Sequence, residues 1–66
     1  MLSTQQRRIM QLIRRSTPVG GWYRISEAVW PVVDGVLPAD LVEIRHDDGH
    51  WLRLTEKGET VMEYLI

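Results

Sequence analysis

Two histidines and two aspartates lie within one short run, His46-Asp47-Asp48-Gly49-His50. Imidazole nitrogens and carboxylates are ligand types that Zn²⁺ takes in proteins. Two partly exposed histidines beside a turn explain the same residues more simply, so we expect no metal ligand set. The two imidazoles should repel each other when both are protonated.

The other polar residues form no catalytic grouping. The chain has no cysteine, which excludes a disulfide, a thiol nucleophile and a zinc–thiolate site. Its nine carboxylates are spread without the spacing of a paired-carboxylate site. Gly20-Gly21 alone is a weak signal for a phosphate-binding glycine loop. We therefore expect neither an enzyme nor a bound cofactor.

The residues that point to a function are arginines and one tryptophan. A guanidinium group binds phosphate or carboxylate through paired hydrogen bonds, and Trp51 is a large aromatic close to a predicted turn. The candidate residues for binding DNA or a protein partner are Arg7, Arg8, Arg14, Arg15, Arg24, Arg45, Trp51 and Arg53.

The charges are polarised along the chain, although the net charge is only −1. Residues 1–25 hold five arginines and no acid, which gives +5. Residues 26–66 hold three cations and nine acids, which gives −6. The protein is therefore dipolar, and its two halves suit partners of opposite charge.

Residues 41–54 are predicted to form a β-hairpin. The apolar residues that alternate with polar ones, as in a half-buried strand, are Val42, Ile44, Leu52 and Leu54. Burial of one face requires Ile44 to oppose Leu52, because a slip of one residue would turn the apolar side chains to solvent. This register leaves residues 47–49 as a three-residue loop, with Gly49 in the left-handed conformation.

The same register places polar residues on the outer face of the hairpin. Glu43 then opposes Arg53 as a charge pair, and Arg45 opposes Trp51 as a cation–π pair. This face is either a solvated strand surface or a surface that contacts a ligand.

A capped helix is predicted directly after the hairpin. Thr55 is a good N-cap, and Glu56 suits the positive end of the helix dipole. The residues that form one apolar stripe are Gly58, Val61, Met62 and Leu65. A glycine inside such a stripe weakens the helix, which indicates close packing of the backbone at Gly58.

Two runs resemble the wing and following helix of winged helix-turn-helix regulators of the MarR and PadR kind. They are Leu41-Val42-Glu43-Ile44-Arg45 and Leu52-Arg53-Leu54-Thr55-Glu56-Lys57-Gly58-Glu59. The resemblance implies an α+β fold, a single small winged-helix domain over residues 1–66. Its elements would be a first helix, a short strand, a second helix, a short or degenerate third helix, a hairpin wing at about 41–54 and a C-terminal helix. It also implies DNA binding.

The first helix is predicted from about Thr4 to Arg15, with Ser3 and Gln6 forming a capping box. Its apolar face consists of Ile9, Leu12 and Ile13, with Met10 at the edge. The opposite face carries Arg7, Arg8, Gln11, Arg14 and Arg15. This face is either a plain solvated surface or a stripe that binds phosphate or an acidic partner. Solvated faces normally mix charges of both signs, so the absence of acids here favours the binding stripe.

A short strand is predicted at residues 22–25. The winged-helix resemblance implies that this strand pairs with the hairpin to give a three-stranded sheet. We expect one of Trp22 and Tyr23 to be packed and the other exposed. Ser26 can cap a second helix.

Residues 26–40 leave room for a second helix and little for a third. Pro31 lies past the first turn of a helix capped by Ser26, Asp34-Gly35 predicts a turn, and Pro38 can open only a single helical turn. The segment holds no Lys, Arg, Asn or Gln. It therefore lacks the side chains that read bases and neutralise phosphates in a recognition helix.

Three functions fit these patterns. One is a DNA-binding transcriptional regulator that contacts double-stranded DNA mainly through the wing and the basic first helix. The alternative is a winged-helix protein–protein interaction module without sequence-specific DNA binding, and a third is a structural subunit of a larger assembly. A 66-residue chain builds only a small core, so we expect a homodimer. No run approaches membrane-spanning length and no signal-peptide pattern is present, so we expect a cytoplasmic protein without membrane contact.

Overall fold

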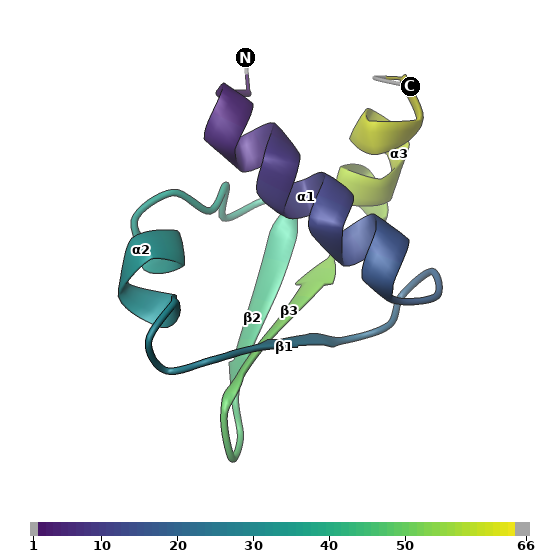
Figure 1. The fold of residues 1–66 in the computed structure, drawn as a ribbon. Helices are drawn as coiled ribbons and strands as arrows, with labels where there is room; N and C mark the ends of the chain where they lie inside the picture. The colour runs from purple at the N-terminus through teal and green to yellow at the C-terminus, as the bar shows by residue number, and fades with distance from the viewer. Residues whose placement is uncertain (1, 65–66) are drawn as a thin grey trace.

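In the computed structural model of residues 2–64, two helices lie at one end of a β-hairpin and a third, short helix lies beside the hairpin (Figure 1). The elements are α1 (Thr4–Ser16), β1 (Tyr23–Ile25), α2 (Trp30–Asp34), β2 (Val42–His46), β3 (His50–Leu54) and α3 (Glu56–Tyr64). The described residues thus form three helices and a three-stranded antiparallel sheet with strand order β1-β3-β2. This is an α+β fold in which β3 is the central strand.

The hairpin adopts the predicted register. Val42 pairs with Leu54, and Ile44 pairs with Leu52. Leu52, Leu54 and Val42 are buried, whereas Ile44 remains 39% exposed on the same face. The prediction that Ile44 belongs to the core is therefore only partly met, since α1 and α3 cover the base of the hairpin and the five-residue α2 is too short to cover the rest.

The turn of the hairpin differs from the prediction. Asp48 is the left-handed residue, with φ 54°, while Gly49 has φ 134°. Aspartate tolerates the left-handed region because its short side chain can form local hydrogen bonds. The conformation of Gly49 is open only to glycine. The expectation that position 49 needs the positive φ of a glycine is therefore met, and the loop spans the predicted three residues. The difference is that Asp48, rather than Gly49, takes the αL value.

β1 adds the predicted third strand to the hairpin. Tyr23 lies opposite Leu52, and Ile25 lies opposite His50, both on β3. Trp22 and Tyr23 are each half-buried, so the expectation that one of them is exposed is wrong. Tyr23 packs against the core, while Trp22 lies on the other side of the sheet by alternation.

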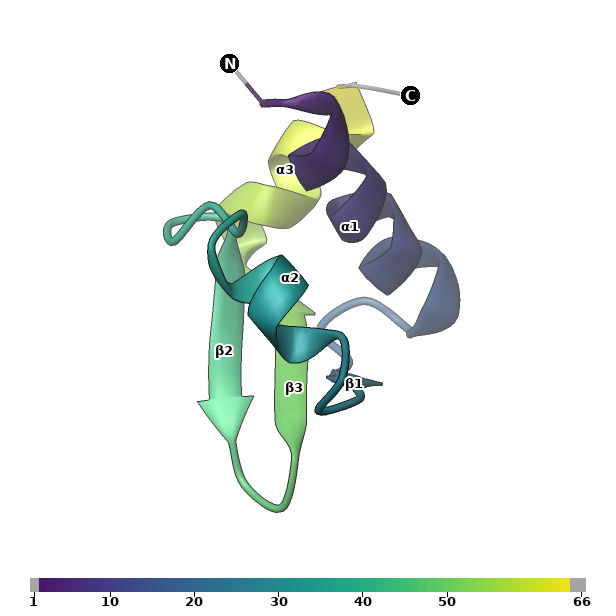
Figure 2. The same cartoon turned by 60° about the vertical axis from the view of Figure 1, so that its left-hand side comes forward.

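The core lies between α1, α3 and the inner face of the sheet. Its most deeply buried side chains are Met10, Ile13, Leu52 and Met62. Met10 is fully buried rather than at the edge of α1, and Leu12 is 40% exposed rather than central. The reason is the placement of α1 beside α3 (Figures 1 and 2), which turns the buried arc of α1 toward Met10.

α1 begins as predicted. The Ser3 side chain accepts a hydrogen bond from the Gln6 backbone N–H at 3.1 Å, and the Gln6 side chain accepts one from the Ser3 N–H at 2.9 Å. The Gln6 side-chain amide also donates to the Val36 carbonyl at 2.9 Å. The capping box therefore joins the start of α1 to the segment that follows α2.

α2 begins later than predicted. The carbonyl of Ser26 accepts hydrogen bonds from the N–H groups of Val29 and Trp30, each at 3.1 Å, which makes a turn before the helix. Pro31 consequently falls in the first turn of α2, where its missing N–H costs nothing. Ser26 is therefore not the N-cap. Within the described chain, residues 35–41 form turns and no helix before β2 begins.

α3 is held tightly against the base of the hairpin. The Thr55 hydroxyl accepts a hydrogen bond from the Gly58 N–H at 3.0 Å, which confirms the predicted cap. Lys57 donates to the Asp40 carboxylate at 3.0 Å, and this hydrogen bond lowers the pKa of that carboxyl. Gly58 is buried, and a Cβ there would overlap the carbonyl oxygen of Leu41. The predicted stripe member Leu65 lies outside the described residues.

Gly58→Ala tests this close approach. Alanine favours a helix by about 1 kcal/mol relative to glycine, yet here its methyl group meets backbone that cannot move freely. We expect a net destabilisation of about 2 kcal/mol, typical of overpacking, and a melting temperature lower by roughly 8–16 °C. Chemical and thermal denaturation followed by circular dichroism measures both.

Gly35→Ala is the matched control. Gly35 has φ −81°, and nothing lies within 4 Å of the position that a Cβ would take there. It should leave stability within about 0.5 kcal/mol of the natural chain, as surface substitutions usually do. A Gly58→Ala protein as stable as the Gly35→Ala protein would contradict the close packing of α3 on Leu41.

Candidate nucleic-acid or partner interface

Four of the predicted contact residues gather on the outer face of the sheet. Tyr23, Val42 and Leu52 face the core, so alternation turns the neighbouring residues of each strand outward. We define the outer sheet face as Trp22, Arg24, Glu43, Arg45, Trp51 and Arg53. Three strands thus contribute one arginine each, and two tryptophans lie among them.

Trp22 is the centre of this surface. The Arg53 guanidinium lies over its ring at 4.5 Å from the centroid, and the Arg45 guanidinium lies at 5.0 Å. Arg45 was expected to stack on Trp51, its partner across the strands. Its guanidinium instead lies over Trp22, so that expectation is wrong. Period-two alternation against the core-facing Tyr23 is the signal that would have placed Trp22 on this face.

Trp51 is anchored near the hairpin turn. Its indole Nε1–H donates to the Asp47 carbonyl at 2.9 Å, and the Arg24 guanidinium lies 5.8 Å from its ring centroid. A tryptophan at this position therefore has a structural role in closing the turn. One face of the Trp51 ring also lies beneath the Arg24 guanidinium.

The arginines of the outer sheet face differ in how strongly they are neutralised. Arg53 donates to the Glu43 carboxylate at 2.7 Å, which confirms the predicted charge pair. Arg45 lies 3.8 Å from Asp47, a much weaker contact. The Arg24 guanidinium packs against Gly49 of the hairpin turn and forms no ion pair within residues 2–64. Arg24 and Arg45 are thus the cations most available to an anionic partner.

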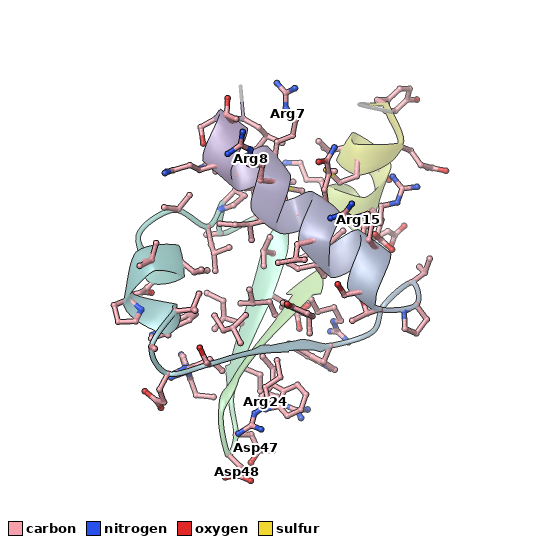
Figure 3. All side chains as sticks on the ribbon, in the orientation of Figure 1. Arg7, Arg8, Arg15, Arg24, Asp47 and Asp48 are labelled. Atoms are coloured by element: carbon pink, nitrogen blue, oxygen red, sulfur yellow. The ribbon has the colours of Figure 1, made fainter. Side chains whose placement is uncertain are left out.

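The arginines of α1 lie elsewhere. Arg7, Arg8 and Arg15 are exposed on α1, at the opposite end of the molecule from the hairpin turn (Figure 3). Arg14 is half-buried, and its Nη1 has no hydrogen-bond partner within the described chain. Because α1 packs on the inner face of the sheet, its outward side chains point away from the outer sheet face. The structure does not bring the two predicted groups of cations onto one surface.

The two histidines form a contact across the hairpin. His46 Nδ1 and His50 Nδ1 lie 2.9 Å apart, so one nitrogen donates and the other accepts. Trp30 stacks on the His50 ring, with centroids 4.6 Å apart and an interplanar angle of 2°. Glu27 Oε1 lies 3.0 Å from His50 Nε2, near enough for an ion pair but without the alignment of a hydrogen bond.

This histidine cluster joins α2 and the turn before it to the hairpin. The His50 side chain is only 14% exposed, since Trp30 covers it. No group of three or more His, Cys, Asp or Glu residues within residues 2–64 is arranged to hold a metal ion. The stacking of Trp30 on the His50 ring makes the cluster a packing contact between the hairpin and α2, a helix with little burial of its own.

His50→Ala tests the role of this contact. Removing the stacked ring should raise the hydrogen-exchange rates of the backbone amides of α2 and cost about 1 kcal/mol of stability, typical of an aromatic pair. His46→Ala removes the edge contact to Trp30, at 5.0 Å and 84°, and the Nδ1–Nδ1 contact to His50, but it leaves the stacked ring in place and should have a smaller effect. Amide exchange followed by NMR measures both. Unchanged protection of α2 in His50→Ala would contradict the inferred role.

A shallow apolar groove lies between α1 and α2. We name it the α1–α2 groove and define it by Ile9, Leu12, Ile25, Val29 and Val33. Its volume is about 300 Å³. Leu12 and Val29 at its rim are 40% and 46% exposed, so apolar surface is open to solvent there.

Comparison with known proteins gives no information on the family or function of the chain. The chain matches no protein-family model, and no curated protein or solved structure matches it significantly. Among the described residues, no helix has the length and apolar character needed to cross a membrane.

Proposed function

We propose that this protein is a small winged-helix DNA-binding protein, a transcriptional regulator that contacts double-stranded DNA through its outer sheet face. The observation that carries the proposal is the arrangement of Arg24, Arg45 and Arg53 around two tryptophans, at 4.5 to 5.8 Å from the ring centroids. The order of elements supports the winged-helix resemblance except at the expected short third helix, where residues 35–41 form turns instead. In the proposal, β2 and β3 form the wing.

Stacking on indole rings prepares the arginines for phosphate contacts. A free arginine side chain loses rotational freedom when it binds, which costs affinity. Arg45 and Arg53 are already held against Trp22, so part of this ordering is complete before DNA arrives. Each phosphate that they neutralise releases counterions, which gives binding that weakens as salt rises.

The proposed binding has low sequence selectivity. α2 is five residues long and contains no cation or amide side chain, and no helix follows it before β2. Base readout in the major groove needs such side chains on an inserted element. Contacts to phosphates and sugars therefore supply most of the affinity, and they carry no direct sequence information.

A second candidate function is protein–protein interaction without sequence-specific DNA binding. The exposed apolar rim of the α1–α2 groove and the absence of a base-reading helix in residues 2–64 favour it. Under this alternative the chain shows no binding to a mixed-sequence duplex even at low salt.

The double substitution Arg24→Ala with Arg45→Ala tests the proposal. It removes the two available cations and leaves the Arg53–Glu43 pair intact. We expect weaker binding to a labelled mixed-sequence duplex and a salt slope reduced by about 2, near one per lost phosphate contact. Fluorescence anisotropy across a salt series measures the affinity and the slope.

Arg7→Ala with Lys57→Ala is the matched control. It changes the net charge equally, and neither residue lies on the outer sheet face. This protein should keep the natural salt slope. No binding by the natural chain at low salt, or equal losses in both double variants, would refute DNA binding through the outer sheet face.

A further inference from the structure

α1 carries an exposed basic stripe that the proposed DNA contact does not use. Arg8, Leu12 and Arg15 are spaced i, i+4 and i+7, so they lie along one side of the helix. Both arginines are exposed, and neither forms an ion pair within residues 2–64. Leu12 between them is 40% exposed and borders the α1–α2 groove. We call these three residues the basic stripe.

α3 carries an acidic stripe with the same spacing. Glu56, Thr60 and Glu63 are also spaced i, i+4 and i+7, and all three are exposed. Neither glutamate forms an ion pair within the described residues. Tyr64 lies next to this acidic stripe and is 86% exposed, although a large aromatic ring gains free energy from burial.

We propose that two copies of this chain associate by docking the acidic stripe of one copy on the basic stripe of the other. Both pairs of charges are separated by seven residues of helix, or about 10.5 Å at 1.5 Å per residue. An antiparallel arrangement brings Arg8 to Glu63 of the second copy and Arg15 to Glu56. Thr60 then lies opposite Leu12, and Tyr64 lies beyond the Arg8–Glu63 pair, where it packs on the start of α1 of the second copy.

The positions of the helices allow this contact to form twice. α1 and α3 lie side by side at one end of the molecule (Figures 1 and 2). Each copy therefore offers one basic stripe and one acidic stripe on the same end, as a two-fold axis requires. The charge polarity of the chain, +5 in residues 1–25 and −6 in residues 26–66, favours a second copy as the occupant.

The association leaves the outer sheet face open in both copies. That face lies on the other side of the sheet from α1. The dimer proposal does not rest on DNA binding, and it is measured in the absence of DNA. Failure of one proposal is therefore distinguishable from failure of the other.

A charge-swap experiment tests the dimer. Arg8→Glu with Arg15→Glu makes both stripes acidic, and Glu56→Lys with Glu63→Lys makes both stripes basic. Each variant alone should be a monomer at concentrations where the natural chain dimerises, with dissociation constants at least about tenfold weaker. An equimolar mixture of the two variants should form a heterodimer, because both contacts then pair opposite charges. Sedimentation velocity measures all four samples.

Tyr64→Ala provides an independent variant that changes no charge. It should weaken self-association and leave the helical circular dichroism signal unchanged, since Tyr64 makes no core contact in the described chain. The dimer of the natural chain should weaken as salt rises. A natural chain that stays monomeric at low salt would overturn the proposal. So would two charge variants that each dimerise as well as the natural chain, or a mixture that forms no heterodimer.

Discussion

The arrangement of the molecule depends on the burial of Leu52 and Leu54 on the inner side of the central strand. Both are 5% exposed or less, and they pair with β2 in a single register. That register turns Trp51 and Arg53 to the opposite side, where the strands on either side add their own arginines. Moving β3 by one residue would place an indole and a guanidinium in the core, so the contents of the outer sheet face follow from how the interior packs.

Features governed by local rules were predictable from the sequence. The capping box at Ser3, the Thr55 cap and the pairing of the hairpin depend on residues only a few positions apart, and each is present as expected. The close approach at Gly58 was also predictable, because a glycine inside an apolar helical stripe weakens the helix and is favoured only where the backbone packs closely. The positions of Pro31 and Pro38 left little room for a third helix, and residues 35–41 form turns.

Features that depend on distant parts of the chain were not predictable. The placement of α1 against α3 determines that Met10 rather than Leu12 is buried, and helical periodicity alone cannot rank the two. Trp22 receives two arginines because β1 pairs with β3 rather than with β2, and no local pattern selects between the two strands of the hairpin. The separation of the α1 arginines from the sheet arginines has the same origin. A count of cations along the chain treats them as one group, while the fold divides them between two surfaces.

The strand order β1-β3-β2 leaves β2 at one border of the sheet, with backbone donors and acceptors that no neighbouring strand of the described chain satisfies. An open five-residue border of this kind is a template on which another extended chain can polymerise. Glu43 and Arg45 both stand on β2. Charged side chains on a border strand discourage such stacking, because an incoming strand would have to strip water from them. The charged side chains of the outer sheet face thus also oppose the edge-to-edge pairing of strands that leads to fibres.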